Sequence, residues 1–218
     1  MSDSPITDVV FDSGGVIFTK GTDIVLRQFQ KCLHKTLHEL MVVFSGDPEW
    51  GPKQKPGELY RAGKITRDEF WACVRDQLSL SDDETVAKME QMWLTSYTPH
   101  PYMFDILAAL QPQYTLTLWT GNVPERITYL DATYDLLKYF SKTCFSFEGR
   151  WAKEQTAAYT SLIEVLAPTP PENALVIDDK PKFVNIARKY GFNAIMFEGP
   201  KQLLVSLRDY GIVVDLAL

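Results

Sequence analysis

Polar groups that could bind a ligand or react stand directly beside short apolar segments at several points of this chain. They are Asp12, Thr120-Gly121-Asn122, Lys153 and Asp178-Asp179. Two adjacent carboxylates at the end of an apolar strand repel each other, and a divalent cation relieves that repulsion. Oxygen ligands of this kind suit Mg²⁺, which takes one or two carboxylates together with substrate phosphate. The pair Asp178-Asp179 therefore predicts a magnesium site.

Each of these groups also has an explanation that needs no function. Asp12 is of a type common in turns, and Thr120-Gly121-Asn122 is good turn chemistry by itself. A single lysine such as Lys153 is by default a solvated surface residue. Taken singly, such groups are more often structural than functional. Their placement at the ends of successive strands favours a shared site.

The strand and helix patterns predict how these groups are positioned. Apolar segments expected as strands cover residues 6–11, 115–119, 143–147, 174–177 and 194–197. Helical patterns cover residues 101–110, 125–131, 132–139, 154–166, 182–190 and 202–210. Strands that alternate with helices predict an α/β fold, a Rossmann-like doubly wound parallel sheet. Ligands bind such sheets outside the carboxyl ends of the strands, where the polar groups fall.

Residues 19–97 interrupt this alternation with helical patterns alone. A helix should begin at Thr22 or Asp23, and capping boxes at residues 66–69 and 81–84 should open two more. Residues 45–57 are dense in glycine and proline and are expected to form a loop. We therefore expect a core domain of residues 1–18 plus 98–218, and an inserted α-helical cap domain of residues 19–97. Hinges between them are expected near residues 18–20 and 97–101.

Composition excludes several classes of function. The 218 residues carry a net charge of −6, which opposes broad nucleic-acid binding through phosphate neutralisation. Three cysteines without a CxxC spacing suit a reducing compartment. The first residues lack the features of a signal peptide, and no apolar run reaches the ~18 residues of a membrane span. We expect a cytoplasmic protein without nucleic-acid or membrane partners; the oligomeric state stays open.

Three motifs in this order resemble those of the haloacid dehalogenase (HAD) superfamily. They are VVFDSGGVI at residues 9–17, LWTGN at 118–122 and VIDD at 176–179, with Lys153 and Tyr159 between the last two. The resemblance covers nearly the full chain. It implies a Rossmann-like core with a small α-helical cap, and a hydrolase that acts on small phosphorylated metabolites.

The resemblance also implies a nucleophile and a metal site. Asp12 would attack phosphorus and form an aspartyl-phosphate, which divides hydrolysis into two steps. Mg²⁺ would be bound by Asp12, the Gly14 carbonyl and Asp179, and by Asp178 directly or through water. Replacement of Asp179 by Asn should then weaken metal binding.

The remaining motif residues would bind the phosphate. Thr120 and the backbone amides of Gly121 and Asn122 would hold phosphate oxygens. Lys153 would neutralise charge on the nucleophile and on the transferring group. Catalysis would come mainly from positioning and electrostatics.

One departure from the family pattern affects the chemistry. Phosphatases of this family usually carry a second aspartate two residues after the nucleophile, as acid and base, and here that position is Gly14. General acid–base catalysis is typically worth ~10²–10⁴ in rate. Glu125 or a cap residue could supply the proton, or the leaving group could need little help, as in a sugar 1-phosphate or an acyl phosphate. If the space beside Gly14 is open, Gly14→Asp should raise turnover of alkyl phosphates.

Two other functions follow from the same fold. A catalytically weak binding or regulatory protein would also tolerate the loss of the acid. The dehalogenase branch lacks the second aspartate as well, and hydrolyses carbon–halogen bonds without metal. Its last motif lacks a paired Asp-Asp, so Asp178-Asp179 favours phosphoryl chemistry.

Several further residues are expected to be structural. His34 and His38 lie four apart on an expected helix, but no third ligand accompanies them. Lys53 and Lys55 are expected to be solvated. The tryptophans at positions 50, 71 and 93 are expected in the cap core rather than as sugar-stacking platforms. Cys144 is expected to be buried and inert.

Overall fold

A five-stranded parallel sheet forms the centre of the protein. The computed structural model describes residues 5–44 and 55–216. The strands are β1 (Asp8–Phe11), β2 (Thr115–Thr120), β3 (Lys142–Phe145), β4 (Ala174–Asp178) and β5 (Asn193–Met196), in the order β3-β2-β1-β4-β5. All four strand pairs are parallel. The α/β, Rossmann-like fold predicted from the sequence is confirmed.

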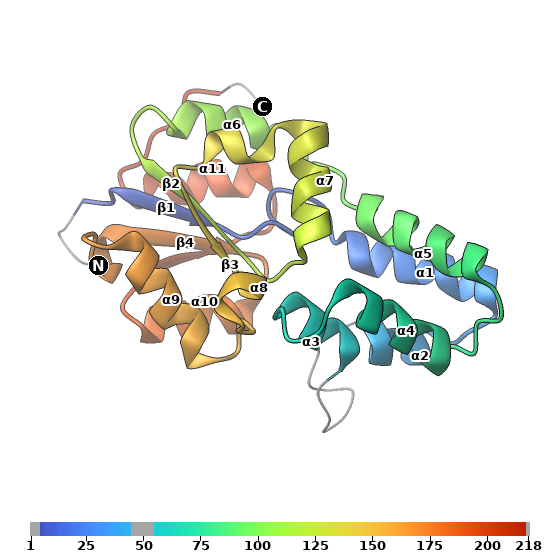
Figure 1. Cartoon of the computed structure of the whole chain (residues 1–218). Helices are drawn as coiled ribbons and strands as arrows, with labels where there is room; N and C mark the ends of the chain where they lie inside the picture. Colours follow the sequence, from blue (N-terminus) through green and yellow to red (C-terminus); the bar gives the residue numbers. More distant parts are fainter. Residues whose placement is uncertain (1–4, 45–54, 217–218) are drawn as a thin grey trace.

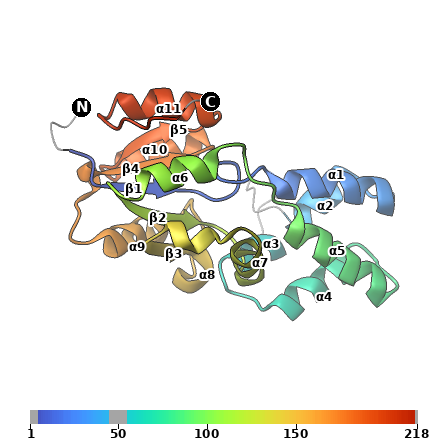
Figure 2. The same ribbon diagram turned by 90° about the horizontal axis from the view of Figure 1, so that it is seen from above.

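Helices cover both faces of this sheet, so its strands are apolar on both sides. Val9 and Phe11 pack on the face covered by α6 (Met103–Leu110) and α11 (Pro200–Arg208). Val10 points to the other face, toward α9 (Thr156–Leu166) and α10 (Pro181–Lys189). Figures 1 and 2 show these two helical layers on either side of the strands. The alternation places successive residues of β1 in two separate hydrophobic clusters.

Several expected boundaries shift by a few residues. The strand expected at residues 143–147 ends at Phe145, because the chain turns there into the short helix α8 (Ser146–Gly149). The two helices expected between residues 125 and 139 are α7 (Pro124–Tyr134) and a 3-10 helix, Leu136–Tyr139. Asp135 separates these two helices in the left-handed conformation, with φ of 51°. The strands that carry the polar groups keep their expected places.

Between β1 and α6 the described residues form helices and no strand of the sheet. The helices are α1 (Gly21–Leu33), α2 (Leu37–Phe44), α3 (Pro56–Arg61), α4 (Arg67–Gln77) and α5 (Asp83–Thr95). We call α1–α5 the helical unit; it lies beside one end of the sheet (Figures 1 and 2). Its core is largely aromatic, with Phe44, Phe70, Trp71 and Trp93 in mutual ring contact.

The helix starts of this unit agree only in part with the sequence patterns. Thr66 and Glu69 form the expected capping box of α4. The next helix is capped by Asp82 rather than Ser81, because Asp82 accepts a hydrogen bond from the Thr85 amide. Helix α1 begins at Gly21 without a side-chain cap, so the expected cap at Thr22 or Asp23 is wrong. Most of the loop expected at residues 45–57 lies outside the described residues, and its last two positions belong to α3, which begins at Pro56.

Two segments that connect the helical unit to the sheet run side by side. The Thr19 amide donates to the Thr98 carbonyl at 2.8 Å, and the His100 amide donates to the Ile17 carbonyl at 2.9 Å. Phe18 also pairs with Pro99 in an antiparallel bridge. The paired segments lie beside Gly14, which itself bridges to Phe18. The residues that enter and leave the helical unit are thus placed next to the first motif.

None of the helices within residues 5–44 and 55–216 has the length and apolarity to span a bilayer.

Candidate active site

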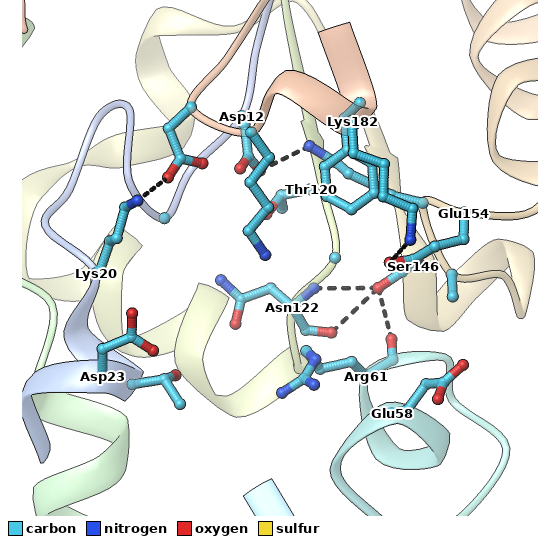
Figure 3. A pocket seen from close by; sticks show the side chains of 18 of the residues that line it. Asp12, Lys20, Asp23, Glu58, Arg61, Thr120, Asn122, Ser146, Glu154 and Lys182 are labelled. Atoms are coloured by element: carbon cyan, nitrogen blue, oxygen red, sulfur yellow. Dashed lines mark hydrogen bonds and ion pairs between the residues drawn. The ribbon is translucent and has the colours of Figure 1, made fainter. Parts of the chain in front are cut away.

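The carboxyl ends of β1, β2 and β4 open into a cavity between the sheet and the helical unit. Its volume is about 370 Å³. The sheet side contributes Asp12, Thr120, Lys153 and Asp179, and the helical unit contributes Arg61 among others. Figure 3 shows Asp12 and Thr120 on one side of this space and Arg61 on the other. The strand ends therefore bring the predicted polar groups together, as expected for a doubly wound sheet.

Three carboxylates converge at one end of the cavity. Asp12, Asp178 and Asp179 each place a carboxylate oxygen within 4.8 Å of the others. Asp12 follows β1, and Asp178 is the last residue of the neighbouring strand β4, which explains the proximity. Gly15 gives Asp179 its place, because a Cβ at position 15 would lie 2.5 Å from the Asp179 carboxyl carbon. Its φ of 93° also favours glycine.

Lys153 holds two of the three carboxylates. Its Nζ lies 3.0 Å from Asp12 Oδ1 and donates to Asp178 Oδ2 at 2.7 Å. The side chain is only 5% exposed, so the alternative of a solvated surface lysine is excluded. The Trp119 ring lies 4.3 Å from Nζ and adds a cation–π contact. The ammonium group is fully engaged by acidic and aromatic partners.

Burial and charge act in opposite directions on these groups. Burial of Asp178 raises its pKa to about 6, with Asp12 adding to the increase and Lys153 opposing it. Burial lowers the pKa of Lys153, but Asp12 and Asp178 raise it by more, so it lies above its usual value. Lys153 is therefore positively charged at neutral pH.

The donor set fits a hard divalent cation. Asp179 Oδ1 is buried and has no hydrogen-bond partner among the described residues, whereas Oδ2 lies 2.8 Å from Lys20 Nζ. Both Asp178 oxygens already accept hydrogen bonds, one from Lys153 and one from the Lys180 amide. Asp179 Oδ1 is thus the oxygen that most needs a cation. Asp178 is better placed to act through water.

The expected phosphate-binding residues lie together at the end of β2. Thr120 is buried beside Asp12 in the cavity wall, and a Cβ at Gly121 would meet no atom within 4 Å. The Asn122 amide differs from expectation, because it donates to Ser146 Oγ at 3.1 Å. The Asn122 side-chain oxygen accepts from the Val123 amide. The Asn122 backbone N–H is therefore already engaged.

The helical unit and the segment before it contribute charged groups that the sequence patterns did not assign to the site. Figure 3 shows Lys20, Asp23, Glu58 and Arg61 around the cavity. Arg61 is half-buried, and desolvation lowers its pKa. Lys20 pairs with Asp179 from the segment that enters α1. No local motif marks these residues, because their proximity to the first motif depends on the packing of the helical unit.

Tyr97 occupies the space beside Gly14. A Cβ at position 14 would lie 2.8 Å from Tyr97 Cε1 and 3.0 Å from its hydroxyl oxygen. The space is filled, so the expected gain from Gly14→Asp no longer holds. Glu125, which was expected as a possible proton source, does not line the cavity, and it accepts a hydrogen bond from the Tyr60 hydroxyl at 2.6 Å.

The residues that were expected to be structural agree with those expectations only in part. His34 ends α1 and His38 belongs to α2, so the two do not share a helix as expected. Lys55 is buried rather than solvated. Trp71, Trp93 and Cys144 are buried as expected, and burial raises the pKa of the Cys144 thiol to about 12. Trp50 and Lys53 lie outside the described residues.

Comparisons with known proteins place this architecture. No family model matches the chain. An uncharacterized protein of Dictyostelium discoideum is 22% identical, over 87% of this chain and 90% of that protein. The HAD family enzyme BT-2542 of Bacteroides thetaiotaomicron, in a magnesium complex, has a TM-score of 0.74 at 19% identity. That match covers 94% of this chain and 100% of the enzyme.

Two further solved structures are similar. A HAD-like family hydrolase of Porphyromonas gingivalis has a TM-score of 0.73 at 20% identity, over 94% of this chain and 98% of that chain. The L-2-haloacid dehalogenase of Xanthobacter autotrophicus, with chloropropionic acid covalently bound, has a TM-score of 0.64 at 20% identity. It is matched over 96% of this chain and 84% of its own.

These likenesses define a class of architecture, a parallel α/β sheet with a helical insertion over the carboxyl ends of its strands. More particularly, the chain has the fold of the HAD hydrolases. The resemblance noted in the motifs is confirmed at the level of the fold.

The raised pKa of Asp178 predicts a pH-dependent stability in the metal-free protein. The native carboxyl binds its proton more tightly than the unfolded one, so stability should fall as pH rises from about 4 to 6. In Asp178→Asn, the fall in the free energy of unfolding over this pH range should be smaller by roughly 2–3 kcal/mol. Denaturant unfolding with a chelator, from pH 4 to 7, measures it. Asp68→Asn, at an exposed carboxyl, is the control, and equal slopes in all three proteins would contradict the prediction.

The contact beside Gly14 predicts a steric coupling. Gly14→Ala should lower the free energy of unfolding by about 1–3 kcal/mol, because the new methyl group meets the Tyr97 ring. The same substitution in a Tyr97→Ala background should cost much less. Gly121→Ala, which adds a methyl group into open space, is the matched control. Equal costs for Gly14→Ala in both backgrounds would refute the contact.

Proposed function

We propose that this protein is a Mg²⁺-dependent hydrolase of small phosphate monoesters that acts through an aspartyl-phosphate on Asp12. The observation that carries the proposal is the convergence of Asp12, Asp178 and Asp179, with Lys153 between two of them, at the end of a cavity. The Bacteroides enzyme of the same fold has been crystallised with magnesium and inorganic phosphate. A small phosphorylated metabolite in a cytoplasmic setting completes the proposal.

In this scheme the protein residues position and activate the nucleophile. Lys153 holds Asp12 Oδ1, which leaves Oδ2 as the oxygen that attacks phosphorus. The Thr120 hydroxyl, the Gly121 amide and Lys153 donate to phosphate oxygens. Asp12, the Gly14 carbonyl and Asp179 would hold Mg²⁺ directly, and Asp178 through water. When bound, Mg²⁺ neutralises the phosphate and the attacking carboxylate.

The helical unit, proposed as a cap domain of residues 19–97, selects the substrate. Asp23, Glu58 and Arg61 line the cavity on the side of the helical unit, and Lys20 lies next to the cluster through its ion pair with Asp179. Such a mixture of charged groups suits a polar leaving group, and a sugar 1-phosphate supplies one that also departs readily. Closure of the cap would exclude water while the aspartyl-phosphate forms.

Two other functions are alternatives to this proposal. The empty acid position at Gly14 favours a weakly active binding or regulatory protein as the second candidate. A dehalogenase is the third, since the fold is shared with one. The Asp178-Asp179 pair favours phosphoryl transfer over it.

A substrate panel separates these functions. Phosphate release from sugar 1-phosphates, acetyl phosphate and aryl phosphates should depend on Mg²⁺ and stop with a chelator. Asp12→Asn should lower the rate at least ~10³-fold, because no other group in the first motif can form the intermediate. Phosphate and Mg²⁺ binding without turnover would favour the binding protein. Chloride release from a 2-chloro acid without metal would favour the dehalogenase.

Asp179→Asn should weaken Mg²⁺ binding at least ten-fold, because Asn supplies a neutral oxygen in place of the unpartnered carboxylate. Isothermal titration of the purified protein with Mg²⁺ measures this without substrate. Asp23→Asn removes another cavity carboxylate outside the cluster and should leave the affinity unchanged. Unchanged affinity in Asp179→Asn would overturn the assignment of the metal site.

A further inference from the structure

We propose that Tyr97 is the general acid for the leaving group, in place of the aspartate that position 14 lacks. This inference rests on the phosphatase function proposed above. Tyr97 lines the same cavity as Asp12, Thr120 and Lys153. It comes from the segment that leaves the helical unit after α5, far along the chain from the first motif.

The position of the phenol carries the inference. A Cβ built on Gly14 would lie 3.0 Å from the Tyr97 hydroxyl oxygen and 3.3 Å from the ring carbon that bears it. The carboxylate oxygens of an aspartate also lie a short distance beyond its Cβ. The Tyr97 hydroxyl therefore occupies the region where an aspartate at position 14 would place its acid.

Two glycines make room for this ring. A Cβ at Gly14 would press on its hydroxyl edge, and a Cβ at Gly21 would collide with Tyr97 Cδ2 on the other edge and with the Ser96 carbonyl oxygen at 2.7 Å. Gly21 is the first residue of α1, directly after the N-cap residue Lys20. Positions 14 and 21, which face opposite edges of the Tyr97 ring, therefore both carry glycine. Such a fit is expected of a side chain with a fixed position.

The remaining contacts hold the ring, and the hydroxyl, which also interacts with the Arg126 guanidinium, belongs to the cavity wall. The guanidinium of Arg126, which is buried, lies 4.4 Å from the ring centroid, and the Phe18 ring packs at 6.4 Å. The hydroxyl lies 3.5 Å from Thr22 Oγ1, another cavity residue. A ring held in this way presents its hydroxyl without a large loss of side-chain entropy on substrate binding.

The proposed step balances. Asp12 Oδ2 forms a bond to phosphorus while the bond from phosphorus to the ester oxygen breaks. The Tyr97 hydroxyl gives its proton to that oxygen, which leaves as an alcohol, and the tyrosine becomes a phenolate. The phenolate then takes a proton from the water that attacks the aspartyl-phosphate. Inorganic phosphate leaves, and both Asp12 and Tyr97 return to their starting states.

The first test is the dependence of rate on the leaving group. In Tyr97→Phe, kcat/KM for an alkyl phosphate should fall ~10²–10⁴-fold, whereas that for 4-nitrophenyl phosphate or acetyl phosphate should fall less than ~10-fold. Good leaving groups need no proton, so their hydrolysis keeps the proposed function visible when the acid is absent. Tyr134→Phe is the matched control, because Tyr134 also packs on Phe18 but does not line the cavity.

Each outcome bears on a defined claim. An equal loss for all leaving groups, or no loss for the alkyl phosphate, overturns the role of Tyr97 and leaves the phosphatase function standing. A selective loss in Asp23→Asn or Glu58→Gln instead of Tyr97→Phe assigns the acid to another cavity residue and also overturns it. Wild-type protein inactive on every phosphate with Mg²⁺ overturns both proposals.

The second test measures binding rather than turnover. In Asp12→Asn protein with Mg²⁺, calorimetry compares an alkyl phosphate with the phosphonate in which a methylene replaces the ester oxygen. With Tyr97 present the ester should bind several-fold tighter, because only it accepts a hydrogen bond at that position. In the double variant Asp12→Asn, Tyr97→Phe, this preference for the ester should disappear. A preference of equal size in both proteins contradicts the contact between Tyr97 and the leaving oxygen.

Discussion

The site depends on the ion pairs that the ammonium group of Lys153 makes with two carboxylates. The ammonium group lies between Asp12 and Asp178, which parallel strands bring together in a buried place. Charges so placed are costly unless they are paired and hydrogen-bonded. Asp178 meets that requirement with both oxygens, whereas Asp179 keeps one oxygen that no described residue contacts by a hydrogen bond. The arrangement thus compensates most of its negative charge and leaves a defined remainder for a cation.

Aromatic side chains of the surrounding fold hold Lys153 in place. Trp119, at the end of β2, places its ring beneath Nζ and is itself packed against Tyr159 at 5.2 Å between ring centroids. Tyr159 in turn stacks on Tyr190 at 4.7 Å. These rings fill the layer between the sheet and α9 and α10. The strands supply the carboxylates, and the aromatic layer fixes the cation that allows them to be buried.

The sequence predicted the core of this site because its information is local. Asp12 follows β1, and Thr120 and Asp178 are the last residues of β2 and β4. The apolar patterns of these strands are short and clear, and parallel strands must end on one side of a sheet. The parts that it missed depend on distant packing. The contact of Tyr97 with Gly14, the position of Arg61 and the bond from the Asn122 amide to Ser146 join segments far apart in the chain. The start of α1 was missed for a related reason, since α1 begins at Gly21, where a side chain would collide with Tyr97 and with the Ser96 backbone.

The origin of Tyr97 in the connecting segment bears on how the site works. An acid at position 14 would belong to the core, whereas a residue that follows α5 could be carried away by movement of the helical unit. Arg126 of α7 opposes such a movement, because it donates to the Trp93 carbonyl at 2.6 Å and lies over both the Trp93 and Tyr97 rings. Burial lowers the pKa of Arg126 to about 10, which still leaves it charged at neutral pH. The end of α5 and Tyr97 are therefore tied to α7 of the core, as α3 is through the hydrogen bond from Tyr60 to Glu125, so the proposed acid keeps its place in the cavity wall that it shares with Asp12.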